Sequence, residues 1–221
     1  MEITPASLEF TCVFYDDSDP VSLAMAWLSL VPQAIVVANA TLVLSRREAE
    51  TMMLLLGQVV NEAANTVFKR ILKEQRPNRW GPGYGLPSAH SQFMAFYATY
   101  IILWMWLKAP HYTRLRRFGR AAFLLSLTAG VTLSRVYLYY HTAKQVLLGT
   151  AVGVAMGALW FVAVQIVRLT RLLDVILDTP LFRYFQVRDT AEYRLYLDDE
   201  YRRWQLGRWK PYKGRAKAKA E

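Results

Sequence analysis

The sequence predicts an all-α membrane protein: a polytopic bundle of about five transmembrane helices, followed by a cytoplasmic amphipathic helix. Two observations lead to this fold class. Hydrophobic residues make up 54% of the 221 residues although the formal net charge is +10, so apolar and basic residues must be segregated along the chain. In addition, several apolar stretches reach the roughly 20 residues that a helix needs to cross the hydrocarbon core.

The five predicted spans differ in polarity. Residues 21–45, 91–107 and 146–167 are long and apolar enough to span by themselves. Residues 51–72 and 118–140 have the length but carry polar side chains. Because polar groups within a span are costly unless they face the bundle interior, we expect the chemistry near these two spans.

Charge predicts the orientation of the bundle. Residues 1–45 contain no Lys or Arg, whereas loops 46–50 and 108–117 and the chain after Arg168 hold most of the basic residues. Since positive loops stay inside, this face is predicted to be cytoplasmic. The chain then divides into a lumenal N-terminal segment, residues 1–20, a membrane domain, 21–168, and a cytoplasmic amphipathic and basic tail, 169–221.

A few basic residues fall on the opposite, lumenal face. Of the 27 Lys and Arg residues, these are Lys69, Arg70, Lys73, Arg76, Arg79, Arg135 and Lys144. They lie at the ends of two spans and the start of a third, and an anionic ligand is the simplest reason for them. We expect Lys69, Arg76 and Arg135 to bind phosphate oxygens, because arginine binds two such oxygens at once.

The segment "PSAH" lies where the third span begins. Ser88 stands at the position of a helix N-cap, so backbone N–H groups near Ala89 and His90 are predicted to point at the same anion. The small side chain of Ala89 lets the backbone approach it closely.

His90 and His141 are two of only three histidines in the chain. An imidazole titrates near neutral pH, so one of them can attack phosphorus while the other protonates the leaving oxygen. Within the second span, Asn65 lies on a polar face with Lys69. We expect it to form interhelical hydrogen bonds and to support that lysine.

The motifs together resemble a known family. Lys69-x6-Arg76-Pro77, then "PSAH", then "SRVYLYYHTAKQ" is similar to the three-part signature of the type 2 phosphatidic acid phosphatase (PAP2) superfamily. The stretches "LPSAHSQFM", "NEAANTVFK" and "FQVRDT", with Gln145, resemble the branch that acts on dolichyl pyrophosphate.

This resemblance implies a function. His141 would form a phosphohistidine, and His90 would serve first as acid and then as base. Ser134 would sit beside the phosphate-binding residues. The substrate would be dolichyl pyrophosphate at the lumenal face of the endoplasmic reticulum, and its hydrolysis would recycle the lipid carrier for protein N-glycosylation.

Two positions depart from the superfamily pattern. Ala89 replaces a glycine, and Gln145 replaces the aspartate that orients the nucleophilic histidine. Gln145 follows His141 by four residues, so on a continuous helix its amide oxygen would accept the imidazole proton. We expect no cofactor and no metal, because cationic side chains replace a divalent ion and the single cysteine, Cys12, excludes most thiolate sites.

Other functions stay open at this stage. A phosphatase for phosphatidate or sphingoid phosphates would share these motifs, and a catalytically inactive lipid-binding scaffold would share the fold. The presence of both histidines and all three cations argues against the scaffold. A vanadate-using oxidase would share the anion pocket, but a lipid-embedded site disfavours it. The predicted partners are membrane lipids and not nucleic acid.

Overall fold

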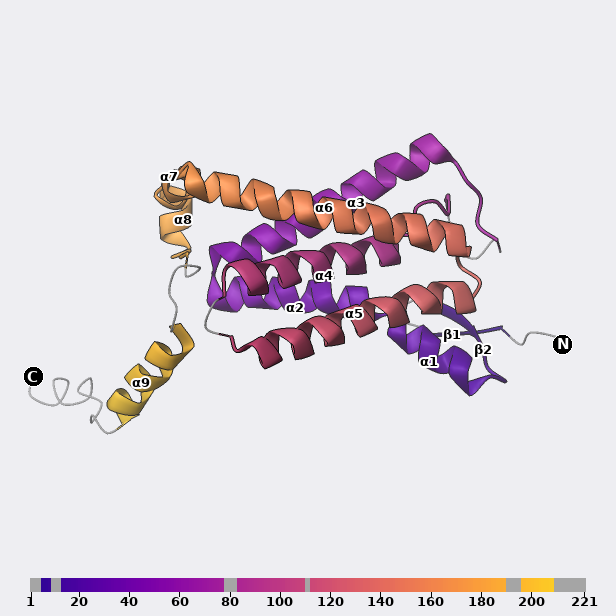
Figure 1. Ribbon diagram of the computed structural model, residues 1–221, viewed down its shortest axis with the longest axis horizontal. Helices are drawn as coiled ribbons and strands as arrows, with labels where there is room; N and C mark the ends of the chain where they lie inside the picture. Colours follow the sequence, from indigo (N-terminus) through magenta and orange to yellow (C-terminus); the bar gives the residue numbers. More distant parts are fainter. Residues whose placement is uncertain (1–4, 9–12, 78–82, 110–111, 190–195, 209–221) are drawn as a thin grey trace, which may run out of the picture.

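The structure, a computed structural model, describes residues 5–8, 13–77, 83–109, 112–189 and 196–208. Its long helices are α2 (Val31–Arg46), α3 (Ala49–Leu72), α4 (Ala89–Leu107), α5 (Arg114–Tyr137) and α6 (Ala143–Leu169). Its shorter helices are α1 (Pro20–Leu28), α7 (Leu172–Leu177), α8 (Pro180–Tyr184) and α9 (Tyr196–Arg208). Figure 1 shows the long helices side by side in a bundle, with α4 in its middle.

The predicted helical segments are present, with one correction. The first predicted span, 21–45, is divided into α1 and α2. Pro32 lies in the first turn of α2 and has no N–H to continue a ladder from α1. Ser29 closes α1 instead, since its hydroxyl donates to the Ala26 carbonyl at 2.7 Å.

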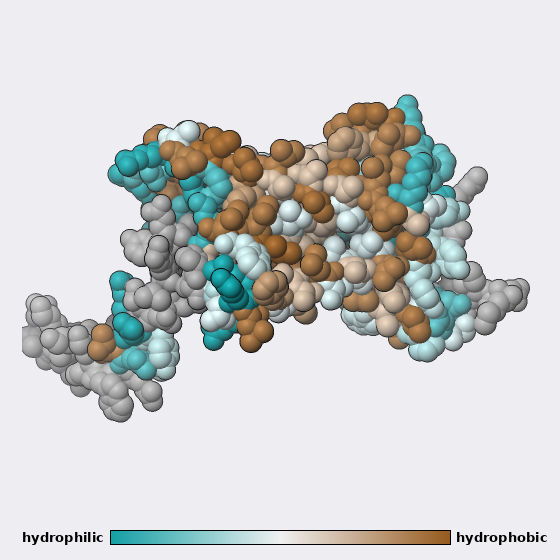
Figure 2. Space-filling view, viewed as in Figure 1, coloured by the Kyte–Doolittle hydropathy of each residue, from teal (hydrophilic) through white to brown (hydrophobic). Residues whose placement is uncertain are grey.

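By length and composition, Pro20–Arg46 and Ala143–Leu169 are the described segments apolar enough to cross a membrane. The count of five spans therefore stays a prediction. Figure 2 nevertheless shows apolar surface over the middle of the bundle and hydrophilic residues gathered toward its two ends.

A short β-hairpin, which the all-α expectation missed, precedes the helices. Strands β1 (Pro5–Leu8) and β2 (Val13–Asp16) pair antiparallel, and each is too short to give a clear sequence signal. The hairpin contacts the loop after α5, because the Phe14 backbone N–H donates to the Tyr140 hydroxyl at 2.8 Å. Strand β2, within the predicted lumenal N-terminal segment, thus lies against the same end of the bundle as His141.

Helices α4 and α6 pack with their backbones in close contact. Gly149, Gly153 and Gly157 recur every four residues along α6 and form the contact surface. A Cβ at Gly149 would lie 2.7 Å from the Ser88 carbonyl oxygen, and one at Gly157 would lie 2.7 Å from the Phe96 oxygen. In lipid the hydrophobic effect contributes little to helix association, so helices associate through close van der Waals packing. Small residues allow the backbones to approach closely enough for it.

Buried amides join α2, α3 and α4. Asn39 donates to Gln58 at 3.1 Å, and Gln92 donates to the Asn61 side chain at 2.9 Å. Asn65 donates to Gln92 at 2.8 Å and to the Pro87 carbonyl at 3.3 Å. The expected interhelical role of Asn65 is thus present, but its bonds reach the "PSAH" segment instead of Lys69.

At the other end of the bundle, Arg168 links the predicted tail, which begins at residue 169, to helix α3. Its guanidinium pairs with Glu50 at 2.6 Å and with Asp189 at 3.1 Å. The Tyr100 hydroxyl donates to the second oxygen of Glu50 at 2.7 Å. The predicted tail, 169–221, therefore begins as part of the bundle. Helix α9 lies within its predicted amphipathic stretch, whereas 190–195 and 209–221 are outside the described residues.

Gly153→Val is expected to lower the free energy of unfolding by about 2 kcal/mol or more, because a side chain at this position meets the Gln92 backbone, which cannot rotate away. Thermal unfolding in detergent measures the effect. Gly119→Val in α5 is the matched control, since nothing lies within 4 Å of its Cβ position. Equal melting temperatures for the two variants would contradict the close packing of α4 on α6.

Candidate active site

The residues of the three motifs meet at one end of the bundle. This end is formed by the last turns of α3 and α5 and the first turns of α4 and α6, on the right in Figure 1. Coulombic interactions link His90 to His141 and to the charges of Lys69, Arg76 and Arg135. The five side chains predicted to carry the chemistry therefore lie near one another, and their binding of one anion stays a prediction.

The first motif turns at the end of α3. The helix stops at Leu72, before Pro77 as the sequence predicts, because Lys73 adopts a left-handed conformation with φ of 49°. The chain that follows contacts the segment just before "PSAH", since the Gly85 N–H donates to the Glu74 carbonyl at 2.8 Å.

Ser88 occupies the predicted N-cap position of α4, but its side chain makes no capping bond to the helix. Its hydroxyl accepts from Ser91 at 3.2 Å, and its backbone N–H donates to the Gln145 carbonyl at 3.1 Å. The first N–H groups of a helix have no partner within it, so those of Ala89 and His90 remain available to an anion.

The third motif folds back on itself after α5. The backbone N–H groups of Tyr140 and His141 both donate to the Arg135 carbonyl at 3.1 Å. The Arg135 guanidinium lies 4.0 Å from the centroid of the Tyr140 ring, and this arginine is only 4% exposed. Among the described residues it forms no ion pair, and its Nε has no hydrogen-bond partner. A buried, uncompensated guanidinium of this kind favours an incoming phosphate.

His141 is held by Gln145, as expected, although not on a continuous helix. His141 lies in the loop, and Thr142 caps α6 through a capping box with Gln145. The His141 Nδ1 atom lies 3.1 Å from the Gln145 Oε1 atom. The contact therefore results from a cap at the helix start, which the four-residue spacing alone does not reveal.

Burial and the charges of Arg135 and Arg76 lower the pKa of His141 to about 3, while the bond to Gln145 acts in the opposite direction. The imidazole is thus neutral at pH 7. With Nδ1 facing an amide oxygen, Nδ1 carries the proton and Nε2 keeps its lone pair. This is the protonation state that a nucleophilic histidine requires.

One predicted residue makes a different contact from the one expected, and two other residues were missed. The Ser134 hydroxyl donates to the Val131 carbonyl of its own helix at 2.7 Å, so its place beside a phosphoryl group stays a prediction. Glu74, which bonds Gln145, and Gln33, whose amide lies 3.5 Å from His90 Nε2, were not singled out. The charge of Glu74 inside "KRILKEQRP" was the signal available for it.

Comparison with known proteins agrees with the motifs. The PAP2 superfamily profile matches residues 50–168. Dolichyldiphosphatase 1 of Dictyostelium discoideum is 38% identical over 88% of this chain and 87% of its own length. Dolichyldiphosphatase 1 of Homo sapiens is 37% identical, over 85% and 84%. The dolichyldiphosphatase of Saccharomyces cerevisiae is 35% identical, over 81% and 79%.

A solved structure shares the fold. The PAP2-type phosphatidylglycerolphosphate phosphatase of Bacillus subtilis superposes with a TM-score of 0.56 at 20% identity. The similarity covers 64% of this chain and 76% of that one.

Acidification is expected to destabilise the ligand-free protein through His141. Its pKa is about 3 when folded and near 6.5 when unfolded, so between these values the unfolded chain binds a proton that the folded site excludes. This loss of folding stability is absent above pH 6.5 and grows as the pH falls toward 3. Melting temperatures in detergent should therefore fall less steeply with pH for His141→Gln than for the native chain. Parallel curves would contradict this protonation state.

Proposed function

The chain belongs to the dolichyldiphosphatase branch of the PAP2 superfamily, and on that premise we propose that it hydrolyses dolichyl pyrophosphate to dolichyl phosphate and inorganic phosphate. The observation that carries the proposal is the convergence of His90, His141, Lys69, Arg76 and Arg135 at one end of the bundle. The product is the form in which the lipid carrier re-enters protein N-glycosylation.

Two displacements at phosphorus give the reaction. The Nε2 lone pair of His141 attacks the terminal phosphorus, and the bond from this phosphorus to the bridging oxygen breaks. His90 protonates that oxygen as dolichyl phosphate leaves. His90 then takes a proton from water, which attacks the phosphohistidine, and inorganic phosphate departs with regeneration of His141.

The cations stabilise the transferred phosphoryl group. Lys69, Arg76 and Arg135 face the charge that develops on its oxygens, with further donors from the backbone at Ala89 and His90. Arg135 is preorganised for this task, because Tyr140 covers one face of its guanidinium and the N-terminal hairpin bonds Tyr140 in turn. These groups supply the charge stabilisation without a metal ion.

The proposal places the protein in the endoplasmic reticulum membrane, with five spans and its active site toward the lumen. The support is the charge distribution. The end of the bundle with the proposed site carries the few basic residues predicted to be lumenal, whereas the opposite end carries Arg46, Arg47 and the basic start of α5. A lipid diphosphate in the lumenal leaflet would then meet the cationic cluster while its polyprenyl chain stays in lipid.

His141→Ala is expected to reduce phosphate release by roughly a thousandfold or more, because no other group replaces the nucleophile. Phosphate release from dolichyl pyrophosphate in detergent measures the loss, and the melting temperature shows whether the variant folds. His111→Ala, the remaining histidine, is the control and should retain turnover. Undiminished release by His141→Ala would exclude this nucleophile.

Substrate choice distinguishes the proposal from its enzymatic rival. We expect kcat/KM on dolichyl pyrophosphate to exceed that on dolichyl phosphate and on phosphatidate by at least about tenfold. An excess of chelator should leave the rate unchanged, since cationic side chains take the place of a metal ion in stabilising charge on the phosphoryl oxygens. A preference for phosphatidate would assign the chain to general lipid phosphate hydrolysis instead.

A further inference from the structure

We propose that Glu74 is a positioning residue for the nucleophile, and that its carboxylate acts through the Gln145 amide to hold His141 with Nε2 free to attack. The inference rests on the proposed function, because it takes His141 as the nucleophile. It also supplies a carboxylate behind the histidine, one side chain further away than the aspartate that Gln145 replaces.

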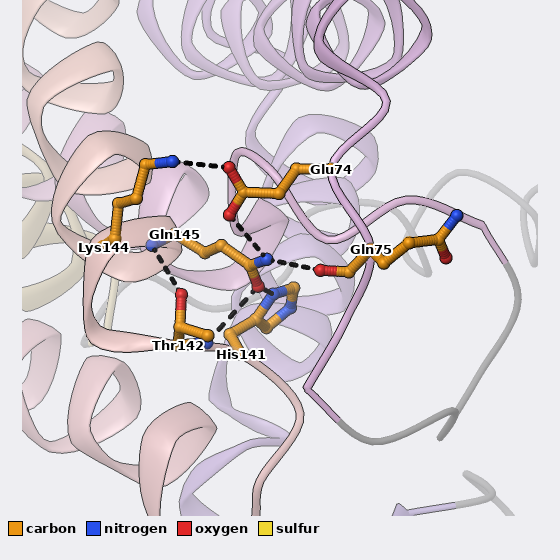
Figure 3. Close-up of polar contacts among 6 residues, drawn as sticks. All are labelled: Glu74, Gln75, His141, Thr142, Lys144 and Gln145. Carbon is orange, nitrogen blue, oxygen red and sulfur yellow. Dashed lines mark hydrogen bonds and ion pairs between the residues drawn. The ribbon is translucent and has the colours of Figure 1, made fainter.

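The Gln145 amide has one orientation that its neighbours accept (Figure 3). Its Nε2 donates to the Gln75 carbonyl at 2.8 Å and to Glu74 Oε1 at 3.1 Å, which uses both amide hydrogens. Its Oε1 faces His141 Nδ1 at 3.1 Å and the Thr142 N–H at 3.3 Å. A rotated amide would set its oxygen against two acceptors and its NH₂ against a donor.

The fixed amide in turn fixes the histidine. Because an acceptor faces Nδ1, the ring carries its proton there and presents the lone pair of Nε2. A carboxylate on the far side of the amide also polarises it, so that Oε1 carries more negative charge. That charge stabilises the positive imidazole ring formed when His141 takes the phosphoryl group.

Glu74 makes two further contacts besides its bond to Gln145. Lys144 pairs with its second oxygen at 2.7 Å, and the Gly85 N–H bonds its backbone carbonyl at 2.8 Å. Hydrogen bonds from Lys144 and Gln145 lower the pKa of the Glu74 carboxyl, so it is ionised at neutral pH. The contact thus joins a charged acceptor to the amide at working pH.

Gly85 packs directly against the amide. A Cβ there would lie 2.7 Å from Gln145 Oε1 and 2.8 Å from Nε2. The loop before α4 therefore needs glycine at this position to let Glu74, Gln145 and His141 align. The amide itself is fully buried, at 0% exposure, so no water competes for its bonds.

A structural alternative gives Glu74 a different role, as the partner of Lys144 in a surface ion pair. The Lys144 side chain is 71% exposed and that of Glu74 30%, and pairs so exposed contribute little to stability. The two roles separate experimentally because the Lys144 ammonium bonds Glu74 Oε2, whereas the Gln145 amide bonds Glu74 Oε1.

Single variants distinguish these roles. Glu74→Ala should lower kcat on dolichyl pyrophosphate by roughly 10- to 100-fold with KM changed less than about threefold, because binding groups are intact while the histidine loses its alignment. Rapid-quench phosphoenzyme formation should slow by the same factor. Lys144→Met should lower kcat by less than about threefold. A wild-type kcat for Glu74→Ala, or an equal loss for Lys144→Met, would overturn the proposal.

Exchanging the two side chains gives a sharper test. Gln145→Glu alone sets two carboxylates against each other and should lose activity. Adding Glu74→Gln restores a donor and acceptor with their roles reversed, and should raise kcat at least about tenfold over the single variant. Full recovery is not expected, because the Gln75 carbonyl loses its donor. A double variant no better than Gln145→Glu would contradict coupling through this bond.

The His141→Ala variant separates the two proposals. If it retains turnover, the nucleophile assignment fails and the role of Glu74 fails with it. If it is inactive while Glu74→Ala has a wild-type kcat, only the positioning role is wrong.

Discussion

One backbone hydrogen bond holds the proposed site together: the Ser88 N–H donates to the Gln145 carbonyl at 3.1 Å and joins the start of α4 to the first turn of α6. It forms because Gly149, one turn further along α6, leaves no side chain between the two helices. The motifs of His90 and His141 lie far apart in sequence, and this contact fixes their relative position. The remaining glycines of α6 extend the same contact along the bundle.

The electrostatics of the site follow from this packing. Three cations are brought together, and Arg135 is buried without a carboxylate partner among the described residues. The mutual repulsion and the desolvation of these three cations oppose folding. The close packing of α4 on the glycines of α6 and the buried amides of α3 and α4 must offset that cost. Burial, together with the same positive field, keeps His141 neutral, so the arrangement that attracts an anion also preserves the lone pair that attacks it.

Much of this arrangement was predictable from the sequence. Helix positions followed from the lengths of the apolar stretches, and motif spacing predicted which histidines and cations lie at one end of the bundle. The hairpin and the break between α1 and α2 were missed, because one depends on short strands and the other on a single proline in an apolar run. Glu74 was missed for a different reason. Its importance lies in a contact with a residue 71 positions away, and no local pattern encodes such a contact.

The substrate gives a physical reason for an amide at position 145. A diphosphate carries more negative charge than a phosphate monoester, and a carboxylate in direct contact with the histidine would repel it from within the site. The Gln145 amide accepts a hydrogen bond from the imidazole without carrying net charge, while the Glu74 carboxylate lies further out, partly exposed and paired with Lys144. Negative charge is thereby kept one side chain away from the phosphorus, yet still coupled to the ring that attacks it.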